Sequence, residues 1–376
     1  MNGVPFFSLA RQHAEIGRDL TAAADRVIRS GSLILGSELA RFEAQFAAYC
    51  GVRRAIGVGN GLDALTLILR ALGIGPGDEV IVPGHTFIAT WLAVTQTGAT
   101  IVPVDIELST YNIDPAATAA AITSKTRAII AVHLYGRLAA VEPLAELAAR
   151  QGVALVEDAA QAHGAMWRGA RAGSFGAAAA FSFYPTKNLG ALGDGGAVTT
   201  NDTALAERIQ RLRNYGSVTK YIHEEAGVNS RLDEMQAAFL TEKLSFLDQK
   251  NARRREIADQ YTRGLSDLPG LILPSTADDA DAVWHLYVVR SAGRTALQDA
   301  LARDSIGALV HYPLPPHRQP AYARTALANA RLPSSDLAGE QVLSLPMWPE
   351  MTDDEVALVV DAVRRATLQT RPSAAG

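Results

Sequence analysis

Between residues 53 and 200 the sequence alternates short β-rich runs with helical runs rich in Ala and Leu. Strands are predicted at 55–58, 79–83, 100–104, 128–132 and 153–156, and helices at 63–72, 88–97 and 144–150. A turn signal, Gly73-Ile74-Gly75-Pro76-Gly77-Asp78, separates the first helix from the second strand. Alternation of this kind predicts an α/β fold, with a mostly parallel sheet and helices on both faces.

The pattern changes near residue 247. Further helices at 201–212 and 232–247 come first, and a basic helix at 250–265 then ends at Asp267-Leu268-Pro269-Gly270. A strand at 284–289, a helix at 296–302 and a short strand at 308–312 precede a proline-rich loop. This order predicts a large domain over 1–247, including an N-terminal segment, and a small α+β domain over 248–376.

Composition excludes several classes of protein. With 376 residues, 48% hydrophobic and 20% charged, the chain is typical of a globular protein of about two domains. A net charge of −4 argues against a strongly basic face, so we expect no nucleic-acid partner. The one cysteine, Cys50, cannot form an internal disulfide or a cysteine metal cluster, and we expect no metal.

The N-terminus has no basic region leading into an apolar stretch, so we expect no signal peptide. A run of about 18 apolar residues is also absent from the sequence, so we expect no membrane-spanning helix. These features predict a soluble, cytoplasmic protein.

Two segments carry the strongest chemical signal. Asp158 follows a predicted strand, at a carboxyl end where open α/β sheets bind ligands, and Lys187 lies in a turn framed by aromatic residues, proline and glycines. Each residue alone is open to a plainer interpretation, a helix cap or a surface lysine. Together they suggest pyridoxal phosphate, because a lysine amine forms a Schiff base with that aldehyde and a carboxylate keeps its pyridine nitrogen protonated.

A phosphate site is predicted where Gly57-Val58-Gly59-Asn60-Gly61 leads from a strand into a helix. Backbone N–H groups and the helix dipole favour an anion at such a helix start. A nucleotide-binding dehydrogenase is the alternative, but the pattern is G-x-G-x-G and not G-x-G-x-x-G. The next strand ends in Pro83-Gly84-His85, which places no acid to bind a ribose hydroxyl.

From residue 4 to about 363 the chain resembles the DegT/DnrJ/EryC1/StrS family of sugar aminotransferases, which has the aspartate-aminotransferase fold of pyridoxal-phosphate enzymes (fold type I). The resemblance is carried by GNGLDALTLILRALGIGPGDEVIVP, TYNIDP, VHLYG, VEDAAQAHGA, FSFYPTKNLGALGDGGAVTTND, NYGS, NSRLDEMQAAFL, HLYVVR and HYPLPPH. It is greatest for the branch that aminates C-3 of dTDP-3-keto-6-deoxyhexoses. Some members replace the lysine with histidine and catalyse dehydration. This chain keeps Lys187, which favours transamination.

The resemblance implies roles for individual cofactor residues. Lys187 matches the Schiff-base lysine and Asp158 the pyridinium partner. The other cofactor residues that it implies are Gln161 near the ring oxygen, Ser182 and the backbone amides of Leu62 and Asp63 on the phosphate, Phe87 stacked on the ring, and Asn229 reaching the phosphate of the neighbouring subunit. To act as a base, Lys187 needs a pKa of ~7–8 in place of about 10.4, and burial and the nearby cofactor would lower it.

The substrate residues are also expected from the resemblance, with support from side-chain chemistry. His311, Tyr312 and His317 match positions that contact the sugar nucleotide. Arg231 is a plausible donor to the diphosphate, and Tyr312 could stack on thymine or on the hexose ring. The polar loop at Lys220, Tyr221 and His223 supplies weaker candidates.

The function expected is transfer of an amino group from L-glutamate, by way of pyridoxamine phosphate, to C-3 of a dTDP-linked 3-keto-6-deoxyhexose. Such a reaction belongs to deoxyamino-sugar biosynthesis, for an O-antigen or an antibiotic, and the family resemblance implies a homodimer with shared active sites. One alternative is an aminotransferase acting at C-4 or on a UDP- or GDP-sugar. A more distant alternative is a non-enzymatic binding or regulatory protein that retains the fold.

Overall fold

A computed structural model describes residues 3–275 and 282–369 of the chain. Its centre is a seven-stranded sheet of order β1-β9-β8-β5-β4-β2-β3. These strands are β1 Arg54–Val58, β2 Glu79–Pro83, β3 Thr100–Val104, β4 Thr126–Val132, β5 Ala154–Asp158, β8 Ala178–Ser182 and β9 Gly196–Thr200. Six strands are parallel to one another, and β9 runs antiparallel to both of its neighbours. The predicted mostly parallel α/β sheet is confirmed, and the five strands predicted between residues 53 and 200 lie within two residues of their observed bounds.

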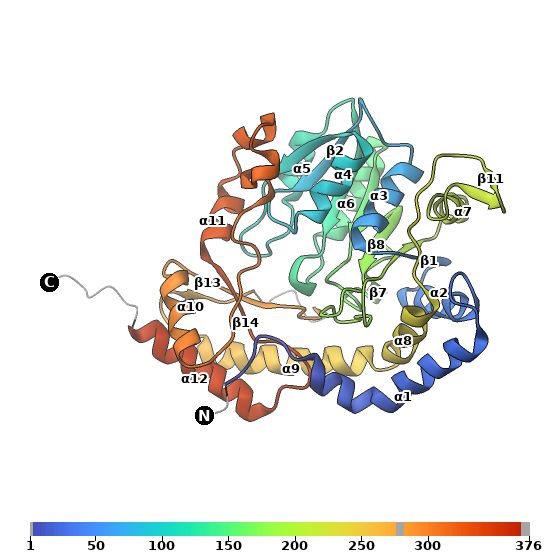
Figure 1. Ribbon diagram of the computed structural model, residues 1–376. Coiled ribbons are helices and arrows are strands. Elements are labelled where there is room, and N and C mark those ends of the chain that lie inside the picture. The colour runs from blue at the N-terminus through green and yellow to red at the C-terminus, as the bar shows by residue number, and fades with distance from the viewer. Residues whose placement is uncertain (1–2, 276–281, 370–376) are drawn as a thin grey trace.

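Helices cover both faces of this sheet (Figure 1). One face packs against α3 Gly61–Ala71, α4 Ala89–Thr97 and α7 Thr203–Leu212, and the other against α5 Pro115–Ala121 and α6 Val141–Gln151. Side chains alternate between the two cores, as Val80 and Val82 face the first and Ile81 the second. Because both faces are buried, the strands have continuous apolar runs rather than an alternating pattern.

The N-terminal residues form two helices that the sequence analysis did not predict. The long helix α1 Leu9–Ser30 packs on α8 Glu234–Leu244, and α2 Ser37–Cys50 packs between α8 and the sheet. Two short hairpins lie outside the larger sheets: β6 Met166–Trp167 with β7 Ala170–Arg171, and β10 Ser217–Thr219 with β11 Ile222–His223. In Figure 1 the β10–β11 hairpin stands at one side of the molecule, away from the sheet.

The C-terminal part has its own core. It contains α9 Leu247–Leu265, α10 Arg294–Arg303, α11 Pro333–Gln341 and α12 Asp353–Gln369, with a small antiparallel sheet of β12 Leu271–Ile272, β13 Tyr287–Ser291 and β14 Val342–Leu345. Val4 belongs to this core and pairs with Ile306, so the chain's beginning packs on its C-terminal part. The division into 1–247 and 248–376 stays a prediction.

The predicted strand at 308–312 is wrong. Only an isolated bridge forms there, between Leu309 and Ser344. Pro313 follows at once and has no backbone N–H, which prevents the ladder from continuing. The segment enters the cavity described below.

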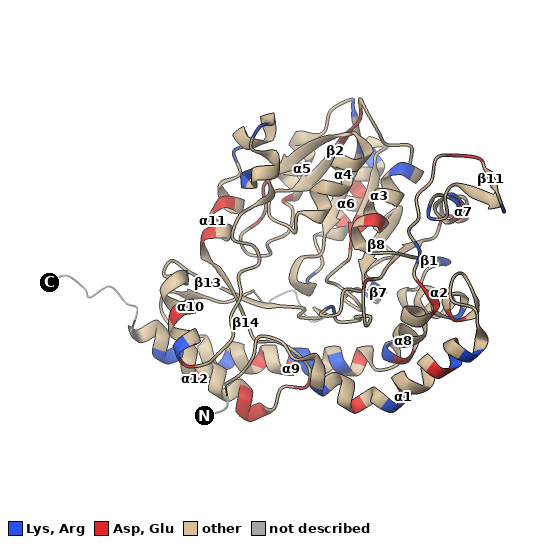
Figure 2. Ribbon diagram, viewed as in Figure 1, with Lys and Arg blue, Asp and Glu red and all other residues tan. Residues whose placement is uncertain are grey.

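Charged residues of both signs are interspersed along α1, α9 and α12 (Figure 2). Within residues 3–275 and 282–369, none of the helices combines the length and the apolar character needed to cross a membrane.

Candidate active site

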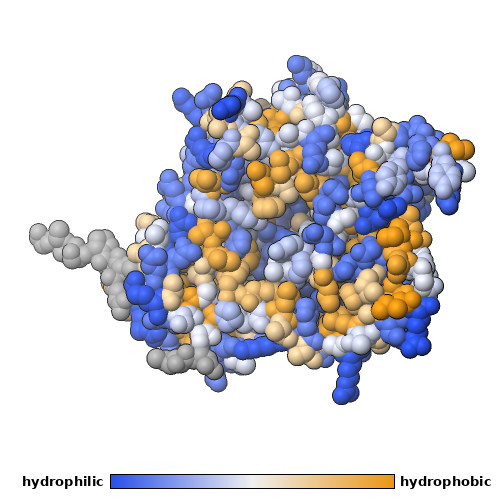
Figure 3. All heavy atoms as spheres, in the orientation of Figure 1, coloured by the Kyte–Doolittle hydropathy of each residue, from blue (hydrophilic) through white to orange (hydrophobic). Residues whose placement is uncertain are grey.

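The carboxyl ends of β5 and β8 meet at one edge of the sheet and border a cavity of about 450 Å³. Asp158 is the last residue of β5, and Ser182 is the last residue of β8. The predicted site residues that line the cavity are Leu62, Phe87, Asp158, Gln161, Ser182, Lys187, His311 and Tyr312. Figure 3 shows hydrophobic residues gathered around a hollow in the middle of one face of the molecule.

Asp158 is buried, with 7% of its surface exposed, and both of its oxygens are hydrogen-bonded. The Thr90 hydroxyl donates to Oδ2 at 2.8 Å and the Ala160 N–H donates to Oδ1 at 3.3 Å. Burial raises the pKa of this carboxyl, and the two donors together with the nearby charge of Lys187 oppose that rise. The side chain is therefore a fixed acceptor that suits a cationic ring nitrogen.

Lys187 lies in the loop that joins β8 to β9, where its N–H donates to the Tyr184 carbonyl at 2.8 Å. Burial lowers its pKa from 10.5 to about 8, against the smaller opposing effect of Asp158. This agrees with the lowering expected for a lysine that acts as a base.

The start of α3, together with the end of β8, is a candidate anion site. A Cβ on Gly61 would lie 2.8 Å from that of Ser182, so only glycine permits this close approach. Gly61 and Leu62 are the first residues of the helix, whose N–H groups have no intrahelical acceptor. The Asp63 N–H, by contrast, donates to the Asn60 side chain at 2.9 Å. Gly61 and Leu62 line the cavity and have N–H groups without an intrahelical acceptor, whereas the N–H of Asp63 is already bonded.

Gln161 and Tyr312 form a pair on another wall of the cavity. The Gln161 Oε1 accepts the Tyr135 N–H at 2.7 Å, and its Nε2 donates to the Tyr312 hydroxyl at 3.1 Å. The rings of Tyr312 and Phe87 lie 5.4 Å apart. His311 Nδ1 lies 2.8 Å from the Ser344 hydroxyl, and burial lowers the pKa of His311 to about 4, so this ring is neutral at pH 7.

Five predicted site residues do not line this cavity: Asp63, Tyr221, Asn229, Arg231 and His317. Tyr221 is 83% exposed near the tip of the β10–β11 hairpin. Asn229 pairs with Asn214, whose side-chain oxygen accepts from Arg231 at 3.1 Å. Ser230 connects this segment to the anion site, because its hydroxyl accepts the Gly59 N–H at 2.9 Å and donates to Asp63 at 2.6 Å.

His317 has a different environment from the one expected. It is buried, and its Nε2 lies 3.0 Å from a carboxylate oxygen of Asp336. This contact lies within the fold, and His317 does not line the cavity.

The sequence analysis gave no role to Thr90 or His285. Thr90 does not line the cavity but donates to Asp158, and His285 lines the cavity. His285 lies in HLYVVR, one of the motifs that carry the family resemblance.

The residues present fit pyridoxal phosphate. Two backbone amides and the Ser182 hydroxyl can hold a phosphate, a buried carboxylate can pair with the ring nitrogen, and an amine of lowered pKa can react with the aldehyde. Phe87 supplies an apolar wall for a ring.

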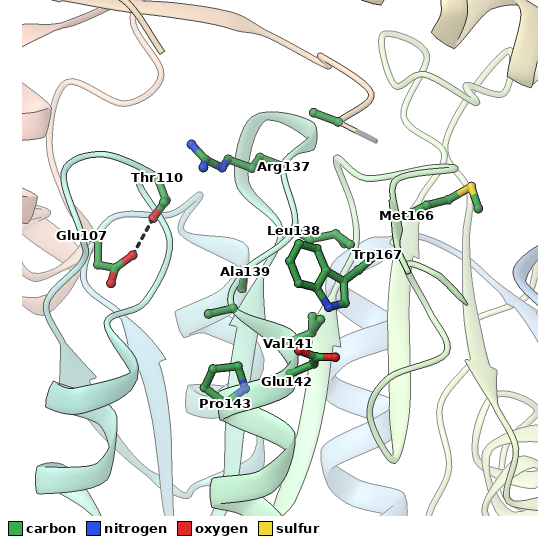
Figure 4. A pocket seen from close by; sticks show the side chains of 12 residues that line it. Glu107, Thr110, Arg137, Leu138, Ala139, Val141, Glu142, Pro143, Met166 and Trp167 are labelled. Atoms are coloured by element: carbon green, nitrogen blue, oxygen red, sulfur yellow. Dashed lines mark hydrogen bonds between the residues drawn. The ribbon is translucent and has the colours of Figure 1, made fainter. Parts of the chain in front are cut away.

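A second cavity, of about 330 Å³, lies between the start of α6 and the β6–β7 hairpin (Figure 4). Its charged groups are already paired. Glu107 accepts the Thr110 hydroxyl at 3.3 Å, and Glu142 accepts from Arg168 at 2.7 Å. Arg137 donates to the Ser109 carbonyl at 3.1 Å. Because no predicted site residue lines this cavity, we assign the chemistry to the first one.

Comparison with known proteins agrees with this geometry. The model of the DegT/DnrJ/EryC1/StrS aminotransferase family matches residues 14–364. The dTDP-3-amino-3,4,6-trideoxy-alpha-D-glucose transaminase of Streptomyces venezuelae is 54% identical over 96% of this chain and 95% of its own length. The dTDP-3-amino-3,6-dideoxy-alpha-D-galactopyranose transaminase of Aneurinibacillus thermoaerophilus is 51% identical over 96% and 99%.

Solved structures extend the likeness to the whole fold. That of S. venezuelae DesV in complex with a ketimine intermediate superposes with a TM-score of 0.96 at 52% identity, covering 99% of this chain and 100% of that one. That of NtdA from Bacillus subtilis with bound cofactor PMP superposes with a TM-score of 0.90 at 30% identity, covering 98% and 86%.

Proposed function

We propose, from the premise that this chain belongs to the DegT/DnrJ/EryC1/StrS aminotransferase family, that it aminates C-3 of a dTDP-linked 3-keto-6-deoxyhexose with L-glutamate as donor. The chain is a pyridoxal-phosphate-dependent sugar aminotransferase. The sugar, the nucleotide, the donor and the roles of the residues are the proposed part. The observation that carries these roles is the presence of Lys187 and Asp158 in one cavity beside the candidate anion site.

Bound pyridoxal phosphate supplies an electrophilic carbon and an electron-withdrawing ring. In our proposal Lys187 would hold the cofactor through Nζ, and as a free amine Nζ would accept and return the α-proton of the amino donor. With a pKa of about 8, about one lysine in eleven is the free amine at pH 7. Asp158 keeps the proton on the ring nitrogen, and the Thr90 hydroxyl holds the carboxylate in place.

The same proposal assigns the phosphate to the N–H groups of Gly61 and Leu62 and to the Ser182 hydroxyl. Phe87 covers the ring, and Gln161 lies at the ring oxygen. His311 and Tyr312 line the side of the cavity where a sugar would enter beside Phe87. The nearby Tyr312 hydroxyl can also donate to a sugar oxygen.

We further propose a homodimer in which each site is completed by its neighbour. Asn229 is exposed and Arg231 is half-buried. The hydrogen bonds of Ser230, which lies between them in the sequence, hold this segment next to the anion site, but neither Asn229 nor Arg231 lines the cavity. Tyr221 and Val218 are exposed apolar residues on the β10–β11 hairpin, which lies away from the sheet. A hairpin of this kind can reach a second copy, and Asn229 and Arg231 would then serve the partner's phosphate and substrate.

The substrate assignment is supported by two relatives, 54% and 51% identical, whose names both specify dTDP-3-amino sugars. The position of amination depends on which carbonyl reaches the cofactor, and a misplacement of about 1 Å can cost ~100-fold in rate. The test is a side-by-side comparison of dTDP-3-keto- and dTDP-4-keto-6-deoxyhexose with excess glutamate, with products identified by mass spectrometry and NMR. The 3-amino product should form faster.

Two controls accompany this comparison. Lys187→Ala should give neither product, and the UDP-linked 3-keto sugar measures how far the nucleotide matters. Faster formation of a 4-amino product would contradict C-3 and leave the aminotransferase assignment in place.

A further inference from the structure

The residue that follows Lys187, Asn188, is buried and hydrogen-bonded at both ends of its amide. Its Nδ2 donates to the Val283 carbonyl at 2.8 Å and to Asn251 Oδ1 at 2.9 Å. Its Oδ1 lies 3.0 Å from Nδ1 of His285. Asn251 comes from α9, and Val283 and His285 come from the segment before β13. One side chain therefore joins the loop of Lys187 to the C-terminal part of the chain.

The orientation of both amides is fixed by two backbone carbonyls. The Val283 carbonyl can only accept, so it must face the NH₂ end of Asn188. Asn251 donates from its own Nδ2 to the His163 carbonyl at 2.8 Å, so its oxygen end faces Asn188. Neither amide can turn over without placing two acceptors in contact. The Asn188 Oδ1 is thus left as the acceptor for His285.

This arrangement also fixes the tautomer of His285. Because Asn188 Oδ1 accepts, Nδ1 of the imidazole must carry a hydrogen, and in the neutral ring Nε2 then has the lone pair. Burial, with a smaller contribution from the charge of Lys187, holds the pKa of His285 well below its ordinary value, so the ring is neutral at pH 7. Among residues 3–275 and 282–369, none forms a hydrogen bond with Nε2, and the ring lines the cavity that holds Lys187.

We propose that His285 is a positioning residue for Lys187: its Nε2 accepts a hydrogen bond from Nζ, and Asn188 holds the imidazole in the tautomer that can do so. This inference rests on the proposed function, because it takes Lys187 as the amine that reacts. The acceptor would hold Nζ inside the cavity whenever the lysine is not attached to the cofactor. It would favour the protonated lysine, because burial otherwise disfavours that charge.

Within the described part of the chain, four titratable groups interact with Lys187 through its charge: Asp158, His163, His285 and His311. Asp158 already accepts from Thr90 and Ala160. His163 is buried between Phe181 and Phe183 and does not line the cavity. His311 lines the cavity, as His285 does, but its Nδ1 is bonded to Ser344 and not to Asn188. His311 is therefore the matched control for His285.

The test measures the pKa of Lys187 directly in the protein without cofactor. A small acylating reagent is applied over a range of pH, and labelling of the Lys187 peptide is quantified by mass spectrometry. The exposed Lys125 and Lys220 serve as internal references. Wild-type Lys187 should titrate near 8. In His285→Leu the pKa should fall by about one unit, since the ammonium loses an acceptor. In His311→Leu the change should be much smaller.

His285→Gln separates hydrogen bonding from packing. A glutamine side chain offers one donor to Asn188 and one acceptor to Lys187, so the pKa of Lys187 should return to within about 0.3 units of wild type. A wild-type pKa in His285→Leu would overturn the proposal, and so would a His285→Gln protein that shifts as far as His285→Leu.

Asn188→Ala provides the test if His285→Leu does not fold. It lets the ring adopt either tautomer, so the pKa of Lys187 should move in the same direction by a smaller amount. An unchanged pKa in this variant would likewise overturn the proposal. Since no sugar or glutamate enters the measurement, a protein that makes no 3-amino product but shows these shifts would refute the proposed function alone.

Discussion

Replacing Asp158 with asparagine should speed attachment of the cofactor to Lys187 and slow transamination, two effects of opposite sign. The faster attachment follows from the pKa of Lys187, which is about 8, whereas that of an ordinary lysine is 10.5. At pH 7 the free amine is then about 9% of the total instead of ~0.03%, a gain of roughly 300-fold. The charge of Asp158 raises this pKa, so its removal lowers it further and increases the free amine.

The loss of rate follows from the other role of Asp158. A neutral amide cannot hold the proton on the ring nitrogen, so the ring withdraws electrons less well. We expect transamination to fall by a hundredfold or more, about 2.7 kcal/mol or greater in barrier. The fold should persist, because asparagine still accepts from the Thr90 hydroxyl and loses only the weaker bond at 3.3 Å to the Ala160 N–H.

The stability of the variant without cofactor should change little, because the lost hydrogen bond is offset by the removal of a buried charge. The folded-state pKa of Asp158 is raised above 3.8, so at pH 7 its ionised form is less favourable in the folded chain than in the unfolded one. Asparagine removes that cost, and the melting temperature should not decrease by more than a few degrees.

Two assays separate these effects. Stopped-flow absorption follows cofactor attachment at pH 7, and a single-turnover reaction with glutamate follows amino transfer. Asp158→Glu is the control that keeps the charge but displaces it. A variant Asp158→Asn that transfers the amino group within tenfold of wild type would refute the reasoning.

Three further predictions concern other parts of the molecule. Borohydride reduction in the presence of pyridoxal phosphate should leave the cofactor on the peptide that contains Lys187, and labelling of a different lysine would contradict the assignment. Mixed Lys187→Ala and Asn229→Ala protomers should partly restore activity, because one site then carries neither change; an active monomer in sedimentation would exclude a shared site. Arg213→Ala should lower the free energy of unfolding by about 3–5 kcal/mol, since it leaves the Glu43 carboxylate without its buried partner; chemical denaturation measures this loss, and a change below 1 kcal/mol would contradict it.

Five of the six parallel strands of the central sheet were predictable because they are buried on both faces, whereas β8 and the antiparallel β9 were not predicted. β2 and β3 have the predicted bounds, since each apolar run ends at a polar residue, proline or glycine. The direction of β9 was not predictable, because Gly196–Thr200 has the same apolar character whichever way it runs. Residues 308–312 have the composition of a strand, but no strand forms there. The proline that follows cannot donate a ladder hydrogen bond, and the segment lies beside the cavity.

The site residues that could be predicted are those that lie at, or shortly after, the end of a strand in the sequence. Asp158 and Ser182 each end a strand, and Lys187 follows five residues after Ser182. The contact between Asn188 and His285 joins residues 97 positions apart, and no local pattern encodes it. The capping bond of the Asp63 N–H was not predictable, because it depends on the conformation of the Asn60 side chain.

The antiparallel strand β9 changes how the loop of Lys187 is ordered. A parallel neighbour would have required a long crossover, whereas β8 ends and β9 begins at the same edge of the sheet. The loop is closed at its base by the Phe183 N–H to Gly195 at 2.7 Å and internally by the Ala191 N–H to Phe183 at 2.8 Å. Its conformational entropy is therefore lost when the protein folds and not when a ligand arrives, so the binding energy of the cofactor is not spent on ordering this loop.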